Sequence, residues 1–180
     1  VSIIVQGRLW GIIACQHQSA LFTNFWKRQT CLFAALTFAN TILAYQEKAD
    51  QQKMARYRSV TKQLLEQVKE ADSIASGLLN GSANLLDLSE AHGAAVCLDG
   101  RIETMGLAPT QEQIRQIMDW LSQEDFNQVI FTRELTKHIP DAAAFREVAS
   151  GLLAIEISRY NKEFILFFKP EIKEKKIWAG

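Results

Sequence analysis

The chain has 180 residues, 48% of them hydrophobic, which is enough for one domain with a real core, or for one domain and part of another. Its 20 basic and 20 acidic residues give a formal charge of zero, so we expect no nucleic-acid binding by phosphate neutralisation. We expect neither a signal peptide nor a membrane span, because the apolar runs fall well short of the ~20 residues that a span needs.

Two short β-branched runs come first. Residues 2–5 and 9–15, separated by Gln6-Gly7, predict an antiparallel hairpin. Gly11 in the second run either permits the close approach of a backbone or ligand, or marks a bulge. Because Val1 already begins a strand, we expect the chain to be cut from a longer protein.

A long helix is predicted next, because no glycine occurs between Gly11 and Gly77 and no proline before Pro109. Apolar residues recur there at helical 3-4 spacing, at Phe22, Phe25, Trp26, Phe33, Leu36 and Leu43, and again at Met54, Tyr57, Thr61, Leu64, Val68, Ala71, Ala75 and Leu78. One helix over about 24–76 would be roughly 80 Å long, too long for one small domain, so we expect a connecting helix whose stripe mediates parallel self-association. Two helices, broken in the polar stretch 46–53, are the alternative.

Residues 85–169 predict an α+β domain on an antiparallel sheet. Asp99-Gly100 is typical of a type I′ hairpin turn. Thr110 is the expected N-cap of an amphipathic helix whose inner face carries Ile114, Ile117, Met118 and Leu121. A buried strand at 128–132, a short helix at 141–149 and two strands at 151–158 and 163–169 follow. The charged run 170–180 is too polar for a core and is expected to project.

The cluster Cys15-Gln16-His17-Gln18 is the main candidate for chemistry. A metal site is not expected, because His92 and His138 lie far away in the sequence. Cys15, at the end of a buried-looking strand, is expected to act as a small hydrophobe, and the three scattered cysteines (Cys15, Cys31 and Cys97) favour a reducing, cytoplasmic setting.

Ligand contact is the remaining role for this cluster. Gln16 and His17 can both donate and accept hydrogen bonds and would face opposite sides of a strand, with a structural role as the alternative. No phosphate loop, nucleophile elbow, paired carboxylates or kinase signature occurs, so no catalytic residue is expected in this segment.

Several distant stretches resemble a known family. GRLWGIIACQHQS (7–19) resembles the last strand of the bilin-binding GAF domain of phytochromes. GAAVCLDGRI (93–102), FREVASGLLAIEIS (145–158) and FFKPEIKEKKIWAG (167–180) resemble the adjoining PHY domain. Glu156 stands where that family frequently has a proline.

The resemblance implies an α+β fold with a GAF/PAS-like antiparallel sheet and flanking helices. A long connecting helix and the terminal hairpin of a truncated GAF domain would precede it. The implied parts are GAF strands at 1–22, a spine helix at 23–80 and a PHY domain at 81–180, with 170–180 as the first part of its tongue.

The implied function is that of a red/far-red photoreceptor fragment. It would bind a linear tetrapyrrole, biliverdin or phycocyanobilin, whose attachment cysteine lies outside this segment. Light-driven change would pass through the tongue and a homodimeric spine to a missing output domain, commonly a histidine kinase that acts on a response regulator. A GAF-type regulatory domain without photosensory function, which binds a small ligand or only dimerises, is the alternative, and a purely structural coiled coil is a third.

The resemblance also implies contacts to the bilin. Gln16 stands where the family has the histidine that bonds the D-ring carbonyl, and His17 lies beside it. Trp178, Ala179 and Gly180 would belong to the tongue that seals the pocket.

Overall fold

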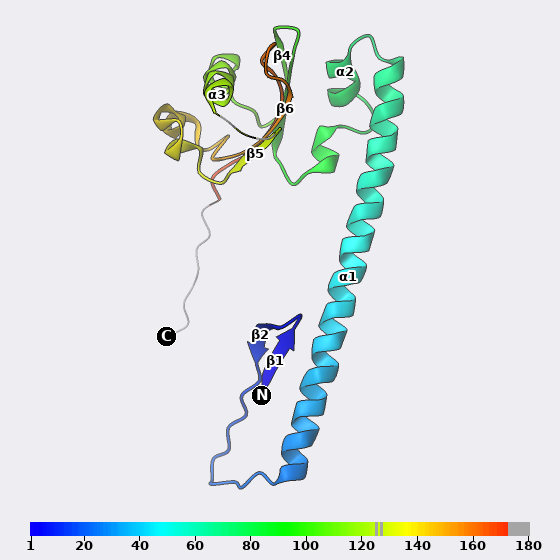
Figure 1. Cartoon of the computed structure of the whole chain (residues 1–180), viewed down its shortest axis with the longest axis vertical. Helices are drawn as coiled ribbons and strands as arrows, with labels where there is room; N and C mark the ends of the chain where they lie inside the picture. The colour runs from blue at the N-terminus through cyan, green and yellow to red at the C-terminus, as the bar shows by residue number, and fades with distance from the viewer. Residues whose placement is uncertain (125, 127, 173–180) are drawn as a thin grey trace. The chain divides into compact units, whose positions relative to one another are not determined.

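The computed structural model describes residues 1–124, 126 and 128–172, which fall within two compact units, Val1–Arg56 and Tyr57–Gly180. In chain order the elements are β1 (Ser2–Val5), β2 (Arg8–Ile12), α1 (Phe25–Glu70), α2 (Ile74–Leu79), the 3₁₀-helix η1 (Leu85–Leu88), β3 (Gly93–Leu98), β4 (Arg101–Gly106), α3 (Gln111–Gln123), β5 (Val129–Thr132), the 3₁₀-helices η2 (Leu135–Lys137) and η3 (Pro140–Phe145), β6 (Gly151–Ser158) and β7 (Glu163–Lys169) (Figure 1).

The first unit begins with the predicted hairpin of β1 and β2. Ile3 pairs with Gly11 but Ile4 pairs with Leu9, so Trp10 is the extra residue of a bulge, which confirms the bulge alternative. The second strand ends at Ile12, earlier than predicted. Just beyond it, the Ile13 N–H donates to the carbonyl of Val1 over 2.8 Å.

A small core joins this hairpin to α1. Ile3 and Val5 pack against Ala35 and Ala39, with Ile42 and Leu43 at the margin. The two alanines, four residues apart, lie on one side of the helix and let the hairpin approach it closely. The bulged Trp10 adds an edge-to-face contact with Phe38, with ring centroids 6.1 Å apart.

α1 is continuous from Phe25 to Glu70, which confirms one long helix rather than two. Asn24 caps its start, because its side-chain oxygen accepts from the Lys27 N–H over 3.0 Å. The helix ends six residues before the predicted position. Ser73 starts α2 instead, since its hydroxyl oxygen accepts from the Ser76 N–H.

The second unit is built on a sheet whose described strands run antiparallel in the order β4-β3-β7-β6-β5. Asp99 and Gly100 join β3 to β4 with φ angles of 51° and 72°. Positive φ at both central positions is what a type I′ turn requires, so this prediction is confirmed.

Two helical layers cover opposite faces of this sheet (Figure 1). On one face, Ile114, Ile117 and Leu121 of α3 are buried with inward residues of β3, β6 and β7. Thr110 caps α3 and forms a capping box with Gln113, as the sequence predicts for the cap. On the other face, α2 and η1 pack on β3 and β7 in a second cluster.

Two local predictions were wrong. The strand at 128–132 is not buried, because β5 pairs with β6 alone among the described strands and its Val129 and Phe131 are exposed. The helix predicted at 141–149 is the shorter 3₁₀-helix η3. Its Ala142 and Phe145 both reach the core, which suits a helix of three residues per turn.

Candidate functional site

Gln16 and His17 lie outside regular structure, in the segment between β2 and α1, and both are exposed. Side chains alternate between the two faces of a sheet only within a strand, and β2 ends at Ile12. The strand geometry therefore gives no reason for Gln16 and His17 to point in opposite directions. Their contact with a ligand stays a prediction.

An apolar cavity of about 670 Å³ lies beside this segment within the first unit. It is lined by Val1, Ile12, Ile13, Ala14, Cys15, Cys31, Ala34, Ala35 and Phe38, and Gln16 and His17 are not among these residues. Cys15 is exposed, so the expectation of a buried hydrophobe was wrong, and it is Cys97 that is buried. Within residues 1–124, 126 and 128–172, no cluster of His, Cys, Asp and Glu is arranged to hold a metal ion.

The base of the predicted tongue is held at Glu171. Its N–H donates to the carbonyl of Arg146 over 3.0 Å, and its carboxylate lies 3.6 Å from the Arg146 Nε. These two contacts set the direction in which the chain leaves β7. Trp178, Ala179 and Gly180 lie outside the described residues, so their part in the tongue stays a prediction.

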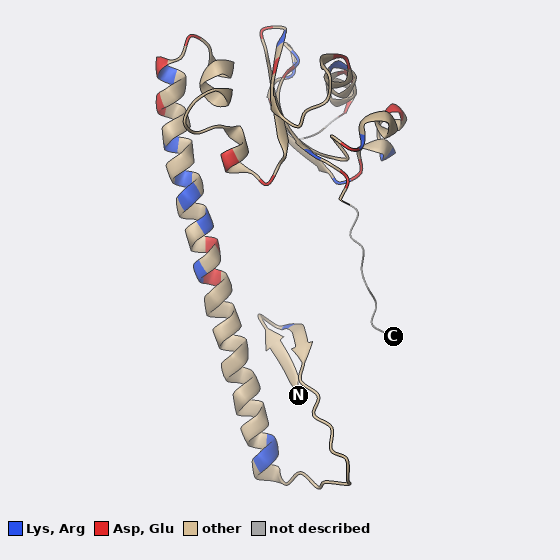
Figure 2. Ribbon diagram, turned by 180° about the vertical axis from the view of Figure 1, so that it is seen from behind, with Lys and Arg blue, Asp and Glu red and all other residues tan. Residues whose placement is uncertain are grey.

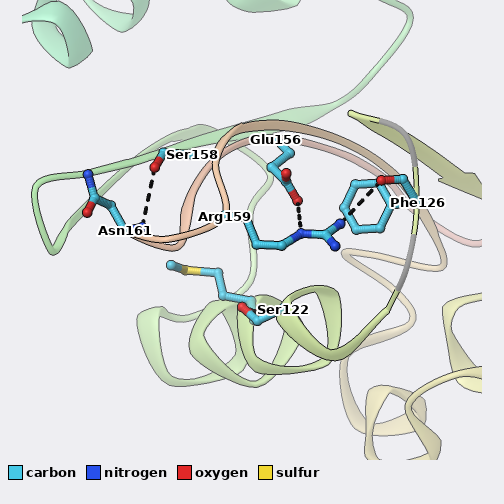
Figure 3. A network of polar contacts seen from close by, with 7 residues as sticks. Ser122, Phe126, Glu156, Ser158, Arg159 and Asn161 are labelled. Carbon is cyan, nitrogen blue, oxygen red and sulfur yellow. Dashed lines mark hydrogen bonds and ion pairs between the residues drawn. The ribbon is translucent and has the colours of Figure 1, made fainter.

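A polar network centred on Arg159 lies at the opposite end of β7, in the β6–β7 turn (Figure 3). Its Nε donates to Glu156 over 3.0 Å, and a terminal nitrogen donates to the carbonyl of Phe126 over 3.2 Å. The guanidinium also lies 5.4 Å from the centre of the Phe126 ring. The Glu156 N–H donates to the Gln128 carbonyl, so the network joins the turn to the connection between α3 and β5.

A second polar cluster surrounds Gln67 near the end of α1. Its side-chain nitrogen donates to the carbonyls of Gly77 and Ala83 over 3.2 and 2.8 Å. Its side-chain oxygen accepts from the Ser82 hydroxyl and the Ala83 N–H over 2.8 and 3.0 Å. The sequence analysis missed this residue. A polar side chain between Leu64 and Val68, on the apolar side of a helix, is the signal that could have found it.

Burial raises the pKa of the Cys97 thiol from 9.0 to about 12, because desolvation disfavours the thiolate. A thiol so held in its protonated form is a poor nucleophile. In the part of the chain that the structure describes, no helix is both long and apolar enough to cross a membrane.

Comparisons with known proteins match most or all of the chain. A family model described as "Phytochrome region" matches residues 57–180. Cyanobacterial phytochrome B of Nostoc sp. is 34% identical over 180 residues, and a phytochrome-like protein of Synechocystis sp. is 35% identical over 185. Both alignments cover 100% of this chain and 24% of the relative, so the chain spans about a quarter of their length.

A solved structure is also similar. The crystal structure of the bacteriophytochrome RpBphP3 from R. palustris matches with a TM-score of 0.67 and 28% sequence identity. The match covers 96% of this chain and 35% of that one.

Proposed function

The chain belongs to the phytochrome family of photoreceptors, and from this premise we propose that it is the relay segment of a red/far-red photoreceptor. Its hairpin is the end of a bilin-binding GAF domain, α1 is the spine, and the sheet that follows belongs to the PHY domain. The observation that carries the proposal is the match of the whole chain, in one order, to phytochromes that extend beyond it on the same polypeptide.

The relay we propose begins at a linear tetrapyrrole, biliverdin or phycocyanobilin, attached to a cysteine outside this segment. It passes through the tongue, in which Trp178, Ala179 and Gly180 contact the chromophore pocket, and through α1. It ends at an output domain of the histidine kinase type that acts on a response regulator, in the cytoplasm. This segment itself carries no catalytic step.

Gln16 is the proposed contact to the D-ring carbonyl. A glutamine amide can donate to that carbonyl as a histidine N–H does, but it does not titrate near neutral pH. The exposure of Gln16 beside an apolar cavity is compatible with this role, since the rest of a GAF domain would cover both. His17 is proposed to lie at the pocket margin.

The test is absorption spectroscopy on the full-length protein that contains this chain, produced together with either bilin. We expect a bilin-dependent band that red and far-red light interconvert. Gln16→Leu should shift this band or lower the photoproduct yield. An unpaired carbonyl in a dry site costs on the order of 1–3 kcal/mol.

His17→Leu is the matched control and should change the spectrum less. Gln16→His should add a pH dependence between about pH 5 and 8 that the wild type lacks. A larger effect from His17→Leu than from Gln16→Leu would show that the two roles are exchanged. A protein without any bilin-dependent absorption would favour the alternative, a GAF-type regulatory domain.

A further inference from the structure

We infer that Gln67 is a positioning residue that locks the end of α1 to the PHY core, so that motion of the helix reaches the sheet. The relay part of this inference rests on the function proposed above. We call the group formed by Gln67, Gly77, Gly81, Ser82 and Ala83 the Gln67 clasp. All its members lie within the second unit.

The first argument is that both the nitrogen and the oxygen of the Gln67 side-chain amide make two hydrogen bonds each. Its two donors face two carbonyls, of Gly77 and Ala83, and its oxygen accepts from an N–H and a hydroxyl. A carbonyl can only accept and an N–H can only donate, so these partners fix the orientation of the amide. One side chain on α1 therefore holds a carbonyl of α2, 10 residues further along the chain, and pairs with the backbone of the loop that follows α2, at Ala83, 16 residues further along.

The second argument is that two glycines make room for the clasp. A Cβ atom on Gly77 would lie 2.7 Å from the Val68 Cα, so only glycine allows α2 this close to α1. A Cβ atom on Gly81 would lie 2.1 to 2.6 Å from the amide atoms of Gln67. A flexible side chain normally yields to such a clash, but this amide is held by four hydrogen bonds and cannot move without breaking them.

The position of the clasp gives it a role in coupling. Leu64 and Val68 flank Gln67 on α1, and Leu64 is buried. The loop that the clasp holds leads into η1, which packs with α2 on one face of the sheet. A rotation or shift of the last turns of α1 therefore displaces that layer with the helix, rather than sliding past it.

The local test is amide hydrogen exchange on the 180-residue chain. Gln67→Met keeps the size of the side chain but loses its four bonds, so exchange at Ala83 and in residues 77–86 should rise by on the order of tenfold. Gln63→Met, at an exposed position one turn earlier on α1, is the matched control and should leave exchange unchanged.

Gly81→Ala is a second variant, which disturbs the hydrogen bonds of the clasp while Gln67 itself is unchanged. It should raise exchange at the same amides, and the double variant with Gln67→Met should add little to either single change, because both act on one amide. Gln67→Glu replaces two donors with a carboxylate that faces carbonyls. Compared with the wild type at the same pH, exchange should therefore be faster at pH 8, and this difference should shrink below about pH 4, where a protonated carboxyl can donate one hydrogen bond again.

The relay test uses the bilin-loaded full-length protein. Gln67→Met should photoconvert like the wild type but lose the light-induced change in exchange over residues 77–88, and Gln63→Met should keep it. If Gln67→Met keeps the wild-type light response, or leaves the Ala83 amide as protected as before, the inference is wrong. A wild type that does not photoconvert overturns the proposed function and the relay with it. In that case the local test still decides whether the clasp exists.

Discussion

Cys97 lies in β3 between Ile102 of β4 and Phe164 of β7, and it is 2% exposed. Burial raises its pKa from 9.0 to about 12, so the folded chain keeps the thiol protonated in a range where the unfolded chain releases the proton. Its stabilising contribution is therefore complete below pH 9 and is lost as the pH rises from 9 towards 12.

The loss of this stabilising contribution at high pH leads to a prediction for Cys97→Ala. At pH 8 the variant should be less stable than the wild type by about 1 kcal/mol, because it loses a packed sulfur atom. At pH 10.5 this difference in stability should shrink by about 2 kcal/mol, or reverse. Above pH 9 each pH unit lowers the contribution of the Cys97 thiol by about 1.4 kcal/mol. Equilibrium unfolding in urea at pH 8 and at pH 10.5 measures the difference in the free energy of unfolding between the two proteins. An equal gap at the two pH values would contradict the raised pKa.

A thiol reagent provides an independent check at the same residue. Cys15 and Cys31 are exposed and should react in the folded chain, whereas Cys97 should react only after unfolding. The buried cysteine thus reports on the integrity of the sheet.

At the scale of elements, the β6–β7 turn depends on Arg159. Glu156, whose side chain is 14% exposed, and the Phe126 carbonyl both accept from this guanidinium. Arg159→Ala should lower the free energy of unfolding by about 1–2 kcal/mol, because Glu156 then loses a charged donor in a poorly solvated place. Exchange should rise in residues 128–132 and 156–165, which the network joins.

Two variants control this prediction. Arg159→Lys keeps the charge but not the planar fork, so it should retain part of the stability. Arg115→Ala removes an exposed arginine from α3 and should change stability by less than about 0.5 kcal/mol. Equal effects of Arg159→Ala and Arg115→Ala would mean that the network does not hold the turn.

Local signals explain which elements could be predicted from the sequence. The turn at Asp99-Gly100 and the cap at Thr110 act within four residues, so their chemistry is visible in the sequence. The exposure of Phe131 depends on the place of β5 at the edge of the sheet, which apolar composition does not reveal. The Gln67 clasp was missed because its partners lie 10 to 16 residues away.

At the scale of the whole molecule, the two halves of the apolar stripe on α1 differ in exposure. In the second half, Leu64 is only 4% exposed and Tyr57 and Val68 are half-buried, so these residues pack within the chain. Self-association through the stripe stays a prediction, and the burial of Leu64 leaves the first half of the stripe as its candidate surface. In the first half Trp26, Phe33 and Leu36 remain exposed, and residues 29–46 carry no charge. Apart from Lys27 and Arg28 at its start, the charged residues of the helix lie further along (Figure 2).

We therefore predict that the spine dimerises through its first half. Phe33→Glu combined with Leu36→Glu should raise the dimer Kd by about 100-fold, roughly 3 kcal/mol, because each charge would be buried without a partner. Sedimentation of the full-length protein measures this change. Leu107→Glu, at an exposed leucine beyond β4, should leave the dimer intact. A wild type that is monomeric at micromolar concentration would contradict the prediction.

The edge strand β5 also affects how the chain behaves at high concentration. Among the described strands β5 pairs on one side only, and a strand edge with exposed Val129 and Phe131 is a template on which a neighbouring molecule can add a strand and begin a fibril. Two features oppose this growth. The strand is only four residues long, and Arg133 follows it directly, with its guanidinium 6.0 Å from the centre of the Phe131 ring. We therefore expect Arg133 to act as a gatekeeper that keeps neighbouring molecules from pairing with this strand.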